Sequence, residues 1–127
     1  MKLKAQHDDG GFSGRGLKWT LETEVGSDLA QVSASWHGGN ADFEIPFDGS
    51  ILLANLAAMD DLNESYSTFT KDAGSIALEI ERDGSIRRWD IHDFGHDGLL
   101  SDYPEVEPFF RFWRPISAAI DSEVALR

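Results

Sequence analysis

Residues 17–25 read LKWTLETEV, with apolar side chains at positions 17, 19, 21 and 25 and polar side chains between them. Alternation with a period of two is typical of a strand that buries one face. The pattern returns at 29–37 and at 41–47, and each return follows a turn that is rich in Gly, Asp or Asn. Three such strands joined by short turns predict an antiparallel meander.

A helix is predicted next, because the apolar period changes after residues 48–50. Leucine and methionine recur at positions 52, 53, 56 and 59, and the intervening alanines favour a helix from about 50 to 62. This helix ends near Asp60, Asp61 and Glu64. Carboxylates at a helix C-terminus oppose the helix dipole, so these three residues hint at another role.

The second half of the chain begins with another predicted hairpin. Residues 76–81 alternate again, Asp83-Gly84 is a strong turn signal, and a return strand is expected from Ile86 to about residue 93. The odd spacing of Ile86 relative to Trp89 and Ile91 predicts a bulge in that strand.

The remaining segments are assigned from composition. Residues 2–7 predict a short strand, 64–73 a polar connection, and 94–104 a loop rich in Gly and Asp. The aromatic run 109–113 predicts a strand, and Pro115 suits the first turn of a second helix. The order of these segments predicts one α+β domain over residues 1–127. We expect an antiparallel sheet of about five to seven strands, with two helices packed on one face.

Acidity is the strongest compositional signal. The chain carries 23 acidic and 11 basic residues, for a net charge of −12, and no Lys or Arg lies between Lys18 and Lys71. Such a field repels nucleic acid and anionic membranes and attracts basic partners. Glu22, Glu24, Asp42 and Glu44 share the outward phase of the first three alternating strands, where like charges repel one another.

These features predict a surface that binds a basic protein, with no direct nucleic-acid or membrane contact. Trp36, beside a glycine pair, is the candidate aromatic anchor. The predicted partner-binding residues are Glu22, Glu24, Trp36, Asp42, Glu44, Asp60, Asp61 and Glu64.

A catalytic or metal site is the alternative, and it centres on His92 and His96. Two histidines four apart, with aspartates nearby, offer nitrogen and oxygen ligands, but that spacing aligns ligands only on a helix. The chain has no cysteine, and it carries no phosphate loop, nucleophile elbow or zinc-peptidase motif. We therefore expect no cofactor, no metal and no catalysis. No signal-peptide core or apolar span is present in the sequence, which predicts a cytoplasmic protein.

In size, acidity and strand–helix order, the chain resembles the small acidic single-domain immunity proteins of bacterial toxin systems. That resemblance implies an inhibitor that masks a basic surface, such as the nucleic-acid groove of a toxin nuclease. A phage-type anti-defence protein that mimics nucleic acid is a second possibility, and it predicts carboxylates spaced like phosphates along one face. The sequence does not specify an oligomeric state.

Overall fold

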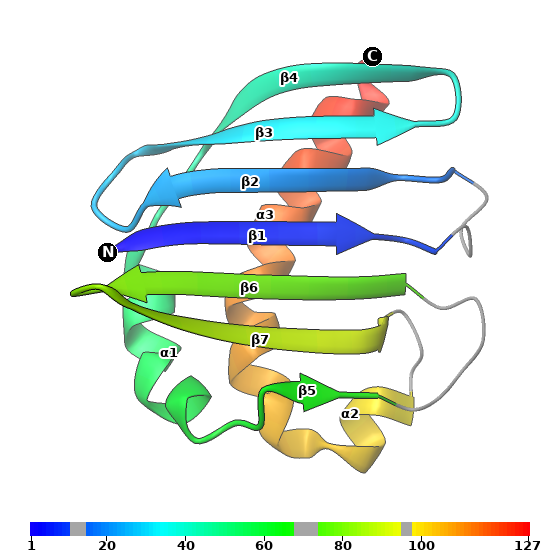
Figure 1. Ribbon diagram of the computed structural model, residues 1–127. Coiled ribbons are helices and arrows are strands. Elements are labelled where there is room, and N and C mark those ends of the chain that lie inside the picture. Colours follow the sequence, from blue (N-terminus) through cyan, green and yellow to red (C-terminus); the bar gives the residue numbers. More distant parts are fainter. Residues whose placement is uncertain (11–14, 68–73, 95–97) are drawn as a thin grey trace.

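The structure is a computed structural model that describes residues 1–10, 15–67, 74–94 and 98–127. It is an α+β fold in which a seven-stranded mixed sheet has its helices on one side (Figure 1). The elements in chain order are β1 (Lys2–Asp8), β2 (Lys18–Glu24), β3 (Leu29–Trp36), β4 (Gly39–Pro46), α1 (Ser50–Asp60), β5 (Ser65–Tyr66), β6 (Gly74–Arg82), β7 (Ser85–Phe94), α2 (Gly98–Asp102), a 3-10 turn (Pro104–Val106) and α3 (Glu107–Ala125).

The strands lie in the order β4-β3-β2-β1-β6-β7-β5. All neighbours are antiparallel except β5 and β7, which run parallel. The predicted meander (β2–β4) and the hairpin β6–β7 are confirmed. Asp83 and Gly84 have φ values of 53° and 80°, which is the backbone of a two-residue hairpin turn. The strand β1 lies between β2 and β6 and joins the two antiparallel units.

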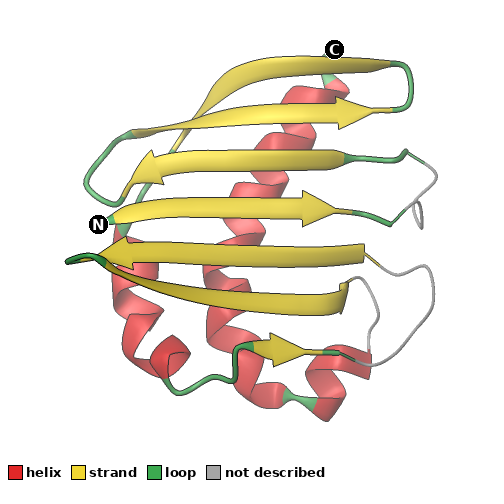
Figure 2. Ribbon diagram, viewed as in Figure 1, coloured by secondary structure: helices red, strands yellow, loops and turns green. Residues whose placement is uncertain are grey.

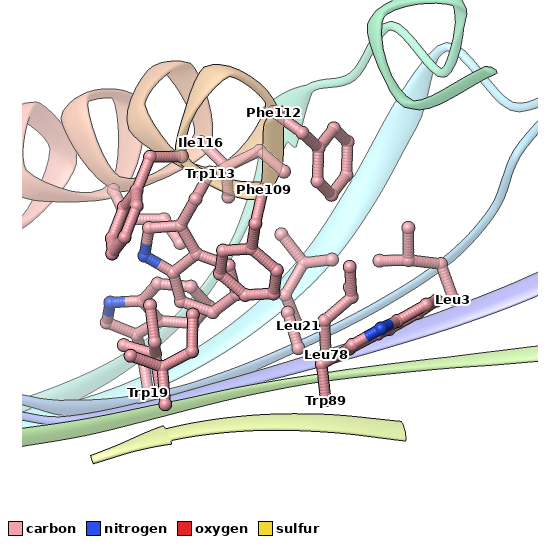
Figure 3. Close-up of a cluster of buried hydrophobic side chains, with 14 of the residues drawn as sticks. Leu3, Trp19, Leu21, Leu78, Trp89, Phe109, Phe112, Trp113 and Ile116 are labelled. Carbon is pink, nitrogen blue, oxygen red and sulfur yellow. The ribbon is translucent and has the colours of Figure 1, made fainter. Parts of the chain in front are cut away.

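The core lies between the sheet and the helices. Trp113 of α3 stacks on Trp19 of β2 and on Phe109, with ring centroids 5.3 and 5.5 Å apart (Figure 3). All three rings are almost fully buried. The helix α3 therefore holds the sheet through stacked aromatic surface, which carries a large share of the apolar area that folding removes from water.

The prediction for residues 109–113 is wrong, because these residues belong to α3 and not to a strand. The helix begins at Glu107, and Pro115 lies inside it and not at its start. Its buried residues recur with the helical period of three and four. They are Phe109, Phe110, Phe112, Trp113, Ile116, Ile120 and Val124. The continuous apolar stripe keeps the chain helical through Pro115, despite the backbone donor that a proline lacks.

Three smaller predictions also need correction. There are three helices and a 3-10 turn instead of two helices, since α2 lies within the predicted loop 94–104. The strand β5 lies within the predicted connection 64–73. Ile86 is 63% exposed and faces away from buried Trp89, so their odd spacing reflects the two faces of the strand. The irregularity predicted for β7 lies at its end instead, where the register passes from the pair Ser75–His92 to the pair Gly74–Phe94 and skips Asp93.

Candidate protein-interaction face

Among the residues that the structure describes, no helix lies over one face of the sheet (Figure 2). On this open face lie the outward-phase side chains of the six long strands, and none of those described is a Phe, Tyr or Trp. It carries eight carboxylates and four cations, a net charge of −4. The acids are Asp8, Glu22, Glu24, Asp42, Glu44, Glu79, Glu81 and Asp90, and the bases are Lys2, Lys4, Lys18 and Arg88.

Cross-strand register places four glutamates beside β1, and Glu44 of β4 lies in the same row as Glu22, beyond Gln31 of β3. Lys2 pairs with Glu24 on one side and with Glu81 on the other. In the next row Lys4 pairs with Glu22, whose carboxylate lies 3.8 Å from the ammonium, and with Glu79 on β6. We call Glu22, Glu24, Glu44, Glu79 and Glu81 the glutamate patch.

The glutamate patch corrects one premise of the sequence argument. The strands that carry Glu22 and Glu44 are not neighbours, because Gln31 of β3 lies between these residues in the register. The acidic stretch that lacks bases in sequence also receives Lys2 and Lys4 from β1 in space. Like-charge repulsion is therefore smaller than the sequence implies, since cations alternate with carboxylates across the rows.

The patch surrounds a broad, open depression of about 1040 Å³ in the sheet face. Leu29 and Ile86 lie among its lining residues, and they are 49% and 63% exposed. Carboxylates around a hollow with apolar side chains beside it can bind basic groups and also bury apolar contacts. The region therefore combines a charge that attracts basic groups with two exposed apolar side chains.

A second depression, of about 610 Å³, lies further along the same strands and is lined by small and amide side chains such as Ser33, Ser75 and Ala77. Both cations in its lining pair with carboxylates of the same lining, and the third carboxylate, Asp42, accepts a hydrogen bond from Ser33 Oγ at 2.6 Å. Lys18 lies 3.8 Å from Asp8, and Arg88 lies 3.0 Å from Asp90. Hydrogen bonds to Asp90 raise the pKa of Arg88, so this guanidinium stays charged. Because two of its three carboxylates are neutralised by cations, the second depression offers a basic partner less net attraction than the glutamate patch.

The eight predicted binding residues do not come together. Glu22, Glu24, Asp42 and Glu44 share the open face. Trp36 is partly buried against the core, in the inward phase of β3, so it lies on the helix side. Asp60, Asp61 and Glu64 lie at and after the end of α1.

The acids at the end of α1 have a structural explanation. Arg87 of β7 donates hydrogen bonds from Nη2 to the carbonyl oxygens of Asp60 (3.1 Å) and Leu62 (2.9 Å). Its Nη1 lies 4.0 Å from the Asp60 carboxylate, and its guanidinium lies over the ring of Trp89. A cation at the helix C-terminus compensates for the carboxylate of Asp60, so for this residue the hint of another role loses its basis.

Sequence reasoning missed Glu79, Glu81, Lys2 and Lys4 as parts of the surface. Their outward phase was readable from the alternation of β1 and β6. The sequence did not show that these residues lie beside Glu22 and Glu24, because β1 pairs with a strand that lies more than 60 residues further along the chain.

The histidine alternative gains little from the structure. His92 is exposed on the open face, opposite Ser75 in register, and His96 lies outside the described residues. Asp90 shares that face with His92, as its spacing predicts, but its carboxylate accepts hydrogen bonds from Arg88 Nε. Within the described ranges, no group of three or more His, Cys, Asp or Glu side chains is arranged to hold a metal ion.

Comparison with known proteins gives no relative. No protein-family model matches the chain, and no curated protein matches it significantly.

In the part of the chain that the structure describes, no helix combines the length and apolar character that a membrane span requires.

Proposed function

We propose that this chain is a non-catalytic binding protein of the inhibitor or immunity type, which masks a basic surface of a partner protein such as a toxin nuclease. One observation carries the proposal. The glutamate patch lies on a sheet face that no helix covers, beside the exposed side chains of Leu29 and Ile86.

The charge of this region supports a basic partner. Five glutamates and the two lysines Lys2 and Lys4 give the patch and its centre a net charge of −3. Such a field speeds the association of a positively charged protein and weakens as salt screens it. The two lysines add discrimination, because a partner that places its own cation against either of them is disfavoured.

The same arrangement favours an inhibitor over a mimic of nucleic acid. A mimic needs a continuous row of carboxylates that stand in for phosphates. Here each row that crosses β1 interrupts its glutamates with a lysine, as Glu24, Lys2 and Glu81 show. An alternating surface fits a protein with its own pattern of charges better than it fits a site for a uniform polyanion.

The test begins with partner isolation from the cell that makes the chain, at low salt, followed by measurement of association and dissociation rates. The variant Glu79→Gln/Glu81→Gln neutralises two glutamates of the patch. We expect about a tenfold slower association and a weaker salt dependence. The matched control, Asp61→Asn/Glu64→Gln, removes the same charge from the end of α1 and leaves the rates unchanged.

Two results would overturn the proposal. In the first, both variants slow association equally, so that only overall charge matters. In the second, the retained partner is acidic or is a nucleic acid. If the partner is a nuclease, stoichiometric addition of the chain abolishes its activity, whereas the patch variant inhibits only at higher concentration.

A further inference from the structure

The two edges of the sheet are very different. The strand β5 at one edge has only two residues, and short strands are one way in which proteins blunt an edge. The strand β4 at the other edge has eight residues, and among the described residues only β3 pairs with it. A long edge strand presents unpaired backbone groups to which another chain can bind.

The register identifies those backbone groups. Phe47 N donates to Asp28 O at 2.8 Å, one step beyond the pair Leu29–Pro46. In an antiparallel pair, hydrogen-bonded and non-bonded pairs alternate. Residues 41, 43 and 45 therefore bond to β3, and the backbone groups of residues 40, 42, 44 and 46 point outward. Pro46 has no N–H, and at its position a backbone N–H would point away from β3, so no hydrogen bond to β3 is lost.

The side chains at these outward positions determine which strand fits. Asn40, Asp42 and Glu44 are exposed, and they face the open side of the sheet. A second copy of this chain fits poorly. Symmetric antiparallel pairing centred on residue 42, 43 or 44 places Asp42 opposite Asp42, Asp42 opposite Glu44, or Glu44 opposite Glu44. Like charges directly opposite each other are destabilising, so the edge disfavours itself and favours a basic strand.

The helix side of β4 restricts the fit further. Phe43 and Ile45 are buried there, and the guanidinium of Arg127 lies 5.0 Å above the ring of Phe43. A cation from an added strand would meet Arg127 on that side. Basic residues are therefore accommodated only at alternate positions, opposite Asp42 and Glu44.

We propose that β4 accepts an extended segment of a partner protein as an eighth strand, with Lys or Arg at alternate positions on the open face and uncharged residues between them. The inference rests on the proposed function for the partner's positive charge, and it shares Glu44 with the glutamate patch. Its other binding groups are backbone atoms of β4 and the carboxylate of Asp42, which lie outside the patch.

Amide hydrogen exchange measured by NMR tests this directly. In the free protein, the amides of Asn40, Asp42 and Glu44 exchange fast, whereas those of residues 41, 43 and 45 are protected. The probe is a synthetic peptide as long as β4, in which lysine alternates with threonine. We expect it to slow exchange at Asp42 and Glu44 by at least about tenfold.

Two controls separate backbone pairing from simple charge attraction. The same peptide with N-methyl groups on the edge that faces β4 keeps its charge, loses its donors and leaves exchange unchanged. A peptide with glutamate in place of lysine also leaves it unchanged. In the protein, Asp42→Pro removes one outward donor without removing a bond to β3, and we expect it to abolish the protection of the Glu44 amide. Asp42→Asn keeps the donor and loses only the charge, so we expect it to weaken that protection.

Three outcomes overturn the inference. The lysine peptide gives no protection, the N-methylated peptide protects equally, or the protein alone shows protection that rises with its own concentration, which indicates a second copy. The proposed function fails separately. An isolated partner that binds without protecting Asp42 and Glu44 refutes only the strand addition. Edge protection by the peptide, with normal partner binding by Glu79→Gln/Glu81→Gln, refutes only the role of the patch.

Discussion

The imidazole of His7 lies parallel to the indole of Trp19, with ring planes at 3° and centroids 5.4 Å apart. Trp19 in turn stacks on Trp113, and Trp113 stacks on Phe109. His7 therefore ends a column of four rings that runs from the central strand β1 into α3, and it is only 8% exposed. A titratable ring thus forms part of the contact between the sheet and the helix layer.

This position makes folding stability depend on pH. Burial lowers the pKa of His7 below its ordinary value of 6.5. The carboxylates of Asp121, Asp9 and Asp8 oppose that shift, and the Arg15 guanidinium adds to it. As pH falls below 6.5, the unfolded chain takes up a proton that the folded chain binds only at lower pH. The free energy of unfolding therefore decreases as the pH decreases, by at most about 1.4 kcal/mol per pH unit.

Urea unfolding between about pH 7.5 and pH 5.5, above the ordinary range of carboxylates, measures this slope. We expect His7→Phe, which keeps a ring against Trp19, to flatten the slope whatever its effect on absolute stability. The control His92→Gln removes an exposed imidazole and keeps the slope. An unchanged slope in His7→Phe would contradict this account of His7.

Arg87 is predicted to hold the end of α1 against β7. Its replacement by Met removes the bonds to the carbonyls of Asp60 and Leu62 but keeps an apolar stem over Trp89. Because the guanidinium is about one third exposed, we expect a loss of about 1–2 kcal/mol in the free energy of unfolding. The neighbouring variant Arg88→Met breaks only the surface pair with Asp90 and costs less than about 1 kcal/mol. Equal losses in both variants would refute the capping role.

Gly49 precedes α1 where the chain passes very close to β2. A Cβ atom there would lie 2.8 Å from Val25 Cγ1 and would overlap the Val25 carbonyl oxygen. We expect Gly49→Ala to lower the free energy of unfolding by about 1–3 kcal/mol. Gly26→Ala adds the same methyl where no atom lies within 4 Å, and it changes stability by less than about 0.5 kcal/mol. Urea unfolding compares the two, and equal effects would argue against the close approach at Gly49.

The lysines of β1 are expected to relieve repulsion within the glutamate patch. Lys2→Gln/Lys4→Gln leaves Glu22, Glu24, Glu79 and Glu81 facing one another across a neutral strand. Because these side chains are largely exposed, the loss is about 1 kcal/mol at low salt and shrinks as salt is added. The measurement is thermal unfolding across a salt series. A loss that does not depend on salt would indicate lost packing of the lysine stems instead.

Local patterns predicted most of the strands and α1, because alternation and helical spacing are readable within a few residues. The failure at 109–113 came from consecutive aromatics, which favour strands locally. The spacing of Phe109, Phe112 and Ile116 was the helical signal, and it continues past Pro115.

The candidate site was only half predictable. Alternation and the predicted meander placed Glu22 and Glu44 on one face with the strand over 29–37 between them, yet they could not show that Lys2 and Lys4 join this face from β1. Strand order depends on contacts between distant residues, and a single sequence does not display those contacts.

The position of β1 between β2 and β6 has a consequence for how the chain is made. The ribosome releases β1 well before β6, since residues 9–73 separate β1 from its second partner. Until β6 emerges, one side of β1 stays unpaired and its inward face lacks the covering helix α3. Such long-range closure slows folding and exposes a nascent chain to aggregation. Chain order alone therefore makes synthesis the stage at which this molecule most needs protection from other chains.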